Sequence, residues 1–220
     1  IIAGSASTFF YLQFAGGPLQ VIAADGLPVQ RFDEQRLLIG VAETYDVIIA
    51  MPADAFVVGT VAANKGYPPR KGFSQLFDAF RIFSDRHADA RLYVHSLLTQ
   101  EHAGPDLVQL AEAHGIRKRT NFVDPYKLHA GIDTETMCAI YNAMDVFCLP
   151  SRGEGFGLPI IEAQACGTPV IVTDFTAMTE LCGAGWLVPP AARDDSLSTP
   201  GAWQAIADVG AIVDALEEAY

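Results

Sequence analysis

From residue 56 onward, short apolar runs alternate with longer segments whose apolar residues recur at helical spacing. This alternation limits the possible folds more strongly than any other feature of the chain. The short runs predict strands at residues 56–62, 91–95, 121–123, 146–149 and 170–173. The longer segments predict helices at residues 71–86, 105–114, 134–143 and 159–166. Because strands and helices alternate, we expect an α/β fold in which helices cover a parallel sheet.

The amino-acid usage changes sharply near residue 55. Residues 1–55 contain no Lys, His or Cys, and they show no helical periodicity. Strands are predicted at residues 7–14, 19–24 and 44–51, joined by turns at residues 16–18, 25–26 and 33–34. The change predicts two domains, a β-rich segment over residues 1–55 and an α/β domain over residues 56–220.

The composition excludes several classes of protein. Hydrophobic residues make up 50% of the chain and charged residues 18%, which is typical of a globular protein and not of a disordered one. The net charge of −12 repels nucleic-acid phosphates and anionic lipid surfaces, so we expect neither nucleic acid nor a membrane as a partner.

Neither the cysteines nor the histidines follow a disulfide or metal-binding pattern. We interpret the four cysteines as buried thiols in a reducing compartment, which predicts a cytoplasmic protein. The five histidines are scattered, so no metal site is predicted. The apolar residues 1–17 contain neither the basic n-region nor the cleavage pattern of a signal peptide, and the apolar run is broken before it reaches transmembrane length, so no targeting segment is expected.

The loop at residues 151–163 carries the clearest sign of function. It follows a predicted strand and contains three glycines at Gly153, Gly155 and Gly157, which allow a close approach of the backbone to a ligand. Pro159 suits the first turn of the helix that follows, whose uncapped N–H groups present a positive dipole. Open α/β sheets bind phosphates at such places.

Two carboxylates accompany this loop, Glu154 within it and Glu162 on the following helix. Their spacing alone occurs by chance, and only the strand, loop and helix around them give it meaning. Glu162 lies where it could accept hydrogen bonds from the vicinal hydroxyls of a sugar. The alternative is a solvent-facing carboxylate in the first turn that complements the helix dipole.

A basic loop at residues 64–73 precedes the first predicted helix of the α/β domain. A Lys at a helix N-terminus is unfavourable against the dipole, so the position of Lys71 suggests an anionic partner. The alternative is a solvated basic loop.

Together these motifs resemble the C-terminal, donor-binding half of family-four glycosyltransferases, which are retaining enzymes of GT-B architecture. The resemblance extends from about residue 56 to the end of the chain, and residues 185–190 and 215–220 also match the family. It implies a Rossmann-like sheet with helices on both faces. The family's domain usually continues into further helices, so we expect this one to be C-terminally truncated.

The resemblance also implies roles for single residues. Glu154 would contact the donor sugar near its reacting carbon, and Glu162 would bind the nucleotide ribose. The backbone of Gly155, Phe156, Gly157 and Leu158 would approach the sugar and phosphates. Lys71 and a second cation would neutralise the diphosphate leaving group; Lys65 takes the place of the family's Arg, with Arg70 as the alternative. Val123 could touch the base.

The expected partner is therefore a UDP-, GDP- or ADP-sugar, bound without a metal ion or other cofactor. In this family the acceptor domain lies N-terminal to the donor domain, and the reaction takes place between the two. A different segment occupies that position here, so we expect donor binding but little sugar transfer by the chain alone.

Residues 4–52 resemble part of a cupredoxin-like domain of multicopper oxidases, through residues 21–26 and 40–49. Copper sites need imidazole and thiolate ligands, which residues 1–55 lack, so no copper chemistry is expected. No Pro-, Gly- or Ser-rich linker separates the two resemblances. The alternative function is therefore that of a chimeric fragment that binds nucleotide without catalysis or has a purely structural role.

Overall fold

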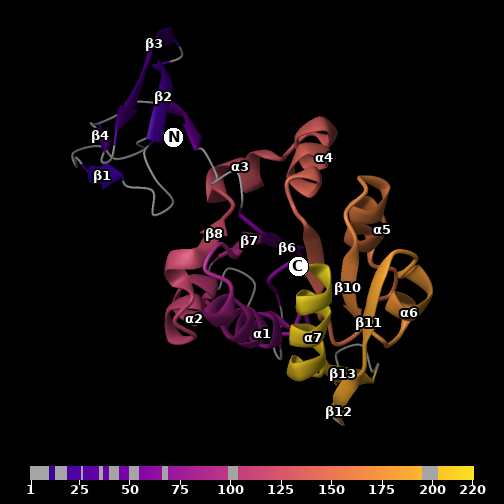
Figure 1. Cartoon of the computed structure of the whole chain (residues 1–220). Coiled ribbons are helices and arrows are strands. Elements are labelled where there is room, and N and C mark those ends of the chain that lie inside the picture. The colour runs from indigo at the N-terminus through magenta and orange to yellow at the C-terminus, as the bar shows by residue number, and fades with distance from the viewer. Residues whose placement is uncertain are drawn as a thin grey trace. The chain divides into compact units, whose positions relative to one another are not determined.

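The computed structural model describes residues 10–12, 19–25, 27–34, 37–39, 45–49, 55–65, 69–98, 104–194 and 203–220. The chain divides into two compact units, Ile1–Ala55 and Phe56–Tyr220, and each is described by itself. Figure 1 shows the elements of both units along the chain.

A six-stranded parallel sheet forms the centre of the second unit. Its strands are β6 (Val57–Val61), β7 (Arg91–His95), β8 (Thr120–Phe122), β9 (Val146–Leu149), β10 (Val170–Thr173) and β11 (Gly185–Val188). Their order across the sheet is β11-β10-β9-β6-β7-β8, and every neighbouring pair is parallel. The first strand of this unit, β6, lies in the middle of the sheet. The next two strands, β7 and β8, are added on one side of β6, and β9, β10 and β11 are added on the other side. The strand order therefore reverses between β6 and β9. The predicted Rossmann-like fold is confirmed.

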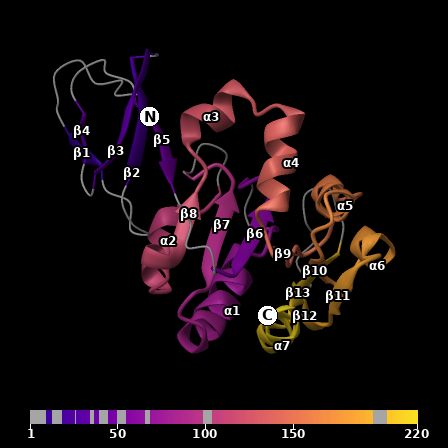
Figure 2. The same ribbon diagram turned by 45° about the horizontal axis from the view of Figure 1, so that its top comes forward.

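Helices cover both faces of this sheet (Figures 1 and 2). The helix α1 packs against α7 and α2 on one face, whereas α5 packs against β9, β10, α4 and α6 on the other. Their bounds are α1 (Phe73–Arg86), α2 (Leu107–Ala113), α3 (Pro125–Ala130), α4 (Thr134–Asn142), α5 (Leu158–Ala165), α6 (Ala177–Leu181) and α7 (Val209–Ala219). A 3-10 helix at Arg117–Arg119 and an antiparallel pair, β12 (Pro190–Asp194) and β13 (Gln204–Ala207), complete the unit. Every strand and helix predicted for this unit begins and ends within two residues of its expected bounds.

The amphipathic pattern of α1 explains how the core forms. Phe73, Phe77, Phe80 and Phe83 recur at three- and four-residue spacing, and all four are buried. They pack against apolar residues of the sheet such as Leu92. Burying a Phe side chain contributes roughly 2 kcal/mol, so this one helix contributes a large part of the unit's stability.

The described part of the first unit consists of antiparallel strands. β2 (Leu19–Ala24) lies between β3 (Leu27–Glu34) and β5 (Tyr45–Ile49), and β1 (Phe10–Leu12) pairs with β4 (Leu37–Ile39). The prediction of a turn at residues 33–34 is wrong, because both residues belong to β3 and pair with Leu19 and Gln20. The predicted turn at residues 16–18 lies outside the described residues.

No helix among the described residues is long and apolar enough to cross a membrane. All four cysteines are free thiols. Only Cys148 is buried, and the other three are half-buried, so the prediction of buried thiols is correct for Cys148 alone.

Candidate functional site

The two loops singled out from the sequence meet where the strand order reverses. Arg70 and Lys71 follow β6, and residues 150–157 follow β9, the neighbour of β6 in the sheet. The backbone N–H of Arg152 donates to the carbonyl of Arg70 over 2.7 Å, and Ser151 Oγ donates to the same carbonyl over 3.1 Å. In open α/β sheets ligands bind outside the carboxyl ends of the strands at such a reversal.

A glycine makes this close approach of the two loops possible. Gly72 precedes α1 in a left-handed conformation, with φ of 68°. A Cβ atom added at Gly72 would lie 1.9 Å from the carbonyl oxygen of Pro150. Both the backbone angle and the space therefore require glycine. The Lys-Gly pair was visible in the sequence, but its contact with residue 150 was not.

An ion-pair cluster centred on Glu154 joins the loops. Lys71 Nζ lies 2.6 Å from Glu154 Oε1, and an Arg70 guanidinium nitrogen lies 3.0 Å from Glu154 Oε2. The same Arg70 nitrogen donates to the carbonyl of Gly153 over 2.7 Å. The side chains of Glu154 and Lys71 are only 6% and 11% exposed. Within the described structure, the anionic partner expected for Lys71 is therefore Glu154 itself.

This arrangement sets the charge of the cluster. Burial alone would raise the pKa of Glu154, but the hydrogen bond and charge of Lys71, with help from Ser151 and Arg70, hold it below the ordinary value. Burial lowers the pKa of Lys71, and Glu154 opposes that shift. With two cations within 3.0 Å of one carboxylate, Glu154 is held in its charged form.

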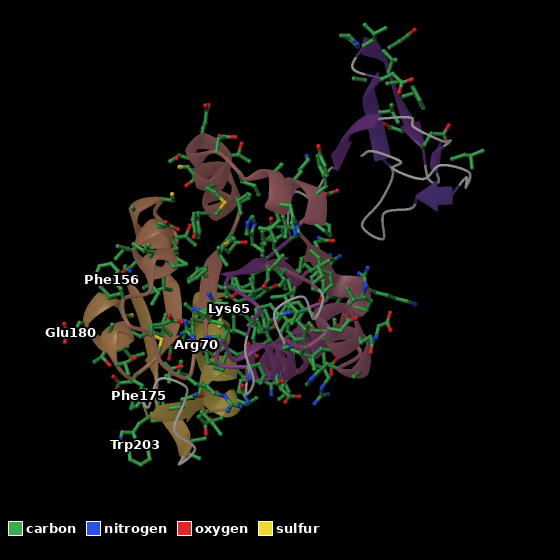
Figure 3. All side chains as sticks on the ribbon, turned by 180° about the vertical axis from the view of Figure 1, so that it is seen from behind. Lys65, Arg70, Phe156, Phe175, Glu180 and Trp203 are labelled. Carbon is green, nitrogen blue, oxygen red and sulfur yellow. The ribbon has the colours of Figure 1, made fainter. Side chains whose placement is uncertain are left out.

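Lys65, the other candidate cation, is exposed, and its positive charge helps to lower the pKa of Lys71. Figure 3 shows Lys65 and Arg70 on the side of the molecule that also carries Phe156 and Phe175. Two cations, Arg70 and Lys71, thus pair with one carboxylate, and the exposed Lys65 adds positive charge near Lys71, in a chain whose net charge is −12. The local excess of positive charge suits an anionic ligand.

The glycine-rich loop leads directly into α5. Gly157 precedes the helix with φ of 92°, and no side chain caps the first turn. Gly155, Phe156 and Leu158 are exposed. An eight-residue helix thus begins with uncapped N–H groups beside the cluster, as expected from the sequence.

Thr176 holds the backbone of Glu154 in place, which the sequence did not indicate. The N–H of Glu154 donates to Thr176 Oγ1 over 3.0 Å. Thr176 lies just before α6 and has φ of 56°, an uncommon angle for a residue with a branched side chain. Sequence reasoning had no signal for this contact, because it depends on how α6 packs.

Glu162 lies apart from the cluster, on the exposed side of α5. Its Oε2 accepts a hydrogen bond of 2.8 Å from the hydroxyl of Tyr141 on α4. Tyr141 is 2% exposed, and burial followed by the Glu162 hydrogen bond raises its pKa. The first turn of α5 contains no acidic residue, so the alternative that placed Glu162 there is wrong. Tyr141 was missed because its apolar body fits the buried side of a helix.

Val123 follows β8, where its N–H donates to the carbonyl of Val94 over 3.0 Å. Its side chain is only 6% exposed, and its contact with a base stays a prediction. Among the described residues, no three His, Cys, Asp or Glu side chains gather closely enough to hold a metal ion.

Two known families match the chain, one mainly over each unit, and the two matches overlap at residues 55–66. Residues 55–200 match the family described as glycosyl transferases group 1, and residues 1–66 match the multicopper oxidase family. D-inositol 3-phosphate glycosyltransferase of Corynebacterium glutamicum (strain R) is 36% identical over 108 residues, which are 47% of this chain and 24% of that protein. Mannosylfructose-phosphate synthase of Agrobacterium fabrum is 36% identical over 118 residues, 53% of this chain and 24% of that protein. The chain thus spans about a quarter of these relatives.

Solved structures show the same fold. Sucrose-phosphate synthase from Thermosynechococcus elongatus aligns with a TM-score of 0.57 and 27% identity, over 76% of this chain and 36% of that one. The C-terminal domain of a group 1 glycosyl transferase family protein from Francisella tularensis aligns with a TM-score of 0.51 and 22% identity, over 74% of each chain. The second likeness concerns the fold alone.

Proposed function

The chain belongs to the glycosyl transferases group 1 family, and from this premise we propose that its second unit binds a nucleotide diphosphate sugar for hexosyl transfer with retention of configuration. The observation that carries the proposal is the contact of 2.6 Å between Lys71 and Glu154 at the carboxyl ends of β6 and β9. It brings the basic loop and the glycine-rich loop together where a Rossmann-like sheet binds its ligand.

Each part of the site has a proposed task. Lys71 and Arg70 neutralise the diphosphate, as fixed positive charges do for a leaving group. Arg70 is preferred to Lys65 as the second cation because it already lies in the cluster, 3.0 Å from Glu154. The uncapped start of α5, with the backbone of residues 155–158, receives phosphate or sugar oxygens. The site has basic side chains for this task and is proposed to work without a metal ion.

Two carboxylates complete the proposed site. Glu154 touches the donor sugar near its reacting carbon while Lys71 keeps it ionised. Glu162, oriented by the hydroxyl of Tyr141, accepts hydrogen bonds from the ribose. Val123 lies beside the base.

Sugar transfer needs more than donor binding. It requires an acceptor held against the donor with water excluded, so we propose that the second unit alone transfers sugar slowly. The match of residues 1–66 to a second family supports another candidate, a chimeric chain that binds nucleotide without catalysis. The free cysteines suit a reducing compartment, and we propose the cytoplasm.

Calorimetric titration of UDP, GDP and ADP into the full chain tests the proposal. We expect one of the three to bind, and Glu162→Ala to weaken that binding at least fivefold. Glu112→Ala serves as the matched control, because Glu112 is an exposed carboxylate on α2, across the sheet from α5. Failure of all three nucleotides to bind would refute the proposal. Binding without any transfer to added acceptors would favour the non-catalytic candidate.

A further inference from the structure

Two thiols face each other across the contact between α4 and α5. Cys138 lies on α4, and Cys166 caps the C-terminus of α5. The S–H of Cys166 donates to Cys138 Sγ, and the two sulfurs lie 3.4 Å apart. Both side chains are half-buried, so a small reagent in the solvent can reach them. The two cysteines are 28 positions apart and neither belongs to a recognisable motif, so nothing in the sequence indicated this pair.

The surrounding contacts fix both sulfurs in place. Asn142 Nδ2 donates to Cys138 Sγ over 3.5 Å. The backbone carbonyl of Tyr141 accepts from Thr168 Oγ1 over 2.8 Å, and the hydroxyl of Tyr141 donates to Glu162. Cys138 thus lies one helical turn before Tyr141, and Cys166 one turn after Glu162. Hydrogen bonds on either side of the thiols hold the two helices together, which keeps the two sulfur atoms close to each other.

We propose that Cys138 and Cys166 are a reversible modification site, which closes to a disulfide by exchange with a small-molecule disulfide such as oxidised glutathione. One cysteine thiolate attacks the reagent and forms a mixed disulfide, releasing the first small thiol. The other thiolate then attacks the protein sulfur of this mixed disulfide and releases the second. The protein loses two protons and two electrons, and the reagent gains them. The sulfurs must approach by about 1.4 Å to reach bonding distance.

If the function proposed above is correct, this disulfide should affect nucleotide binding. A disulfide would join α4 to α5 at one end of the contact that orients Glu162. It would therefore alter the position or the mobility of the carboxylate that binds the ribose. In a reducing compartment such bonds are transient, which suits a site that responds to oxidation.

Peptide mapping of the full chain after treatment with oxidised glutathione tests the modification. When the treated chain is unfolded and alkylated, we expect two of the four thiols to be unreactive, a linked peptide that contains both Cys138 and Cys166, and reversal by dithiothreitol. The oxidised chain should remain monomeric on a non-reducing gel. Its Tm should rise on the order of 5 °C because the bond closes a loop.

Three variants make this test specific. Cys138→Ser and Cys166→Ser should each abolish the linked peptide, whereas Cys182→Ser, which removes another half-buried thiol, should keep it. The proposal is overturned if all four thiols stay reactive, if glutathione remains on one cysteine without a linkage, or if the linked peptide contains Cys148 or Cys182.

Nucleotide titration of the oxidised and reduced chain tests the consequence. We expect the Kd of whichever of UDP, GDP or ADP binds to change at least threefold on oxidation, and Cys138→Ser to remove that change. Equal affinities in a cross-linked chain would refute the effect on the site. If neither form binds nucleotide, the proposed function fails, while the peptide map still decides whether the disulfide forms.

Discussion

Lys71 Nζ and Glu154 Oε1 lie 2.6 Å apart, although the two residues are 83 positions apart in the sequence. One follows β6 and the other follows β9, the two strands between which the strand order reverses. Their side chains are nearly inaccessible to solvent, so each charge depends on the other. The pair therefore contributes both to the stability of the unit and to the proposed site.

Glu154→Gln should destabilise the protein by roughly 3 kcal/mol, because it leaves the Lys71 ammonium buried without its counter-ion. Combining it with Lys71→Met should restore part of that loss. Urea unfolding of the four proteins of this cycle measures the coupling. Asp85→Asn is the control, since Asp85 pairs with Arg81 on the exposed surface of α1 and should cost less than about 0.5 kcal/mol. A Glu154→Gln variant as stable as the wild type would contradict a coupled pair.

The contribution of Glu154 to the free energy of unfolding should depend on pH. Its pKa in the folded protein lies below the ordinary value of 4.5, so its contribution is complete above about pH 4.5. The contribution is lost as the pH falls through the lowered pKa. The difference in unfolding free energy between wild type and Glu154→Gln should therefore shrink between pH 5 and pH 3. Other carboxylates with lowered pKa values, such as Asp133 and Glu217, are common to both proteins and cancel. A difference that is constant over this range would refute the assignment.

Gly72→Ala should be much more damaging than Gly115→Ala. Both glycines have positive φ, 68° and 73°, so each substitution costs about 1 kcal/mol in backbone strain. Only at Gly72 would the new Cβ also collide with the carbonyl of Pro150, whereas nothing lies within 4 Å at Gly115. Thermal unfolding should show a loss at least twice as large for Gly72→Ala. Equal losses would mean that the two loops are not packed as described.

Tyr141→Phe should weaken nucleotide binding severalfold, although Tyr141 is proposed only to position Glu162. The substitution keeps the buried ring and removes the hydroxyl that donates to Glu162 over 2.8 Å. The cost in stability should be about 1 kcal/mol. Tyr220→Phe is the control. It also removes a tyrosine hydroxyl, which lies at the end of α7 and contacts Asp89. Calorimetry would contradict the positioning role if both variants bound nucleotide as the wild type does.

Most of the strands and helices from β6 to β10 could be predicted because their apolar periodicity is strong, whereas α3 and the elements after β10 were not predicted. The loop between β9 and α5 could also be predicted, since its glycines and Pro159 are local signals of a loop followed by a helix. Contacts across the fold were not predictable. The Lys71–Glu154 pair depends on β6 and β9 being neighbours in the sheet, and the Tyr141–Glu162 pair depends on the packing of α4 against α5. In the first unit, Asp33 and Glu34 resemble a turn by type, but pairing with β2 outweighs that weak preference.

The most direct test of a diphosphate site between β6 and β9 is the ratio of two dissociation constants. For the nucleotide that binds, calorimetry should give a Kd for the monophosphate at least tenfold above that for the diphosphate, as charge-assisted hydrogen bonds to the second phosphate require. Lys71→Gln should lower this ratio at least threefold, because only Arg70 and the start of α5 then remain to bind the second phosphate. Lys118→Gln, a change at an exposed lysine of the 3-10 helix, should leave the ratio unchanged. Equal binding of monophosphate and diphosphate by the wild type, or an unchanged ratio in Lys71→Gln, would contradict the account.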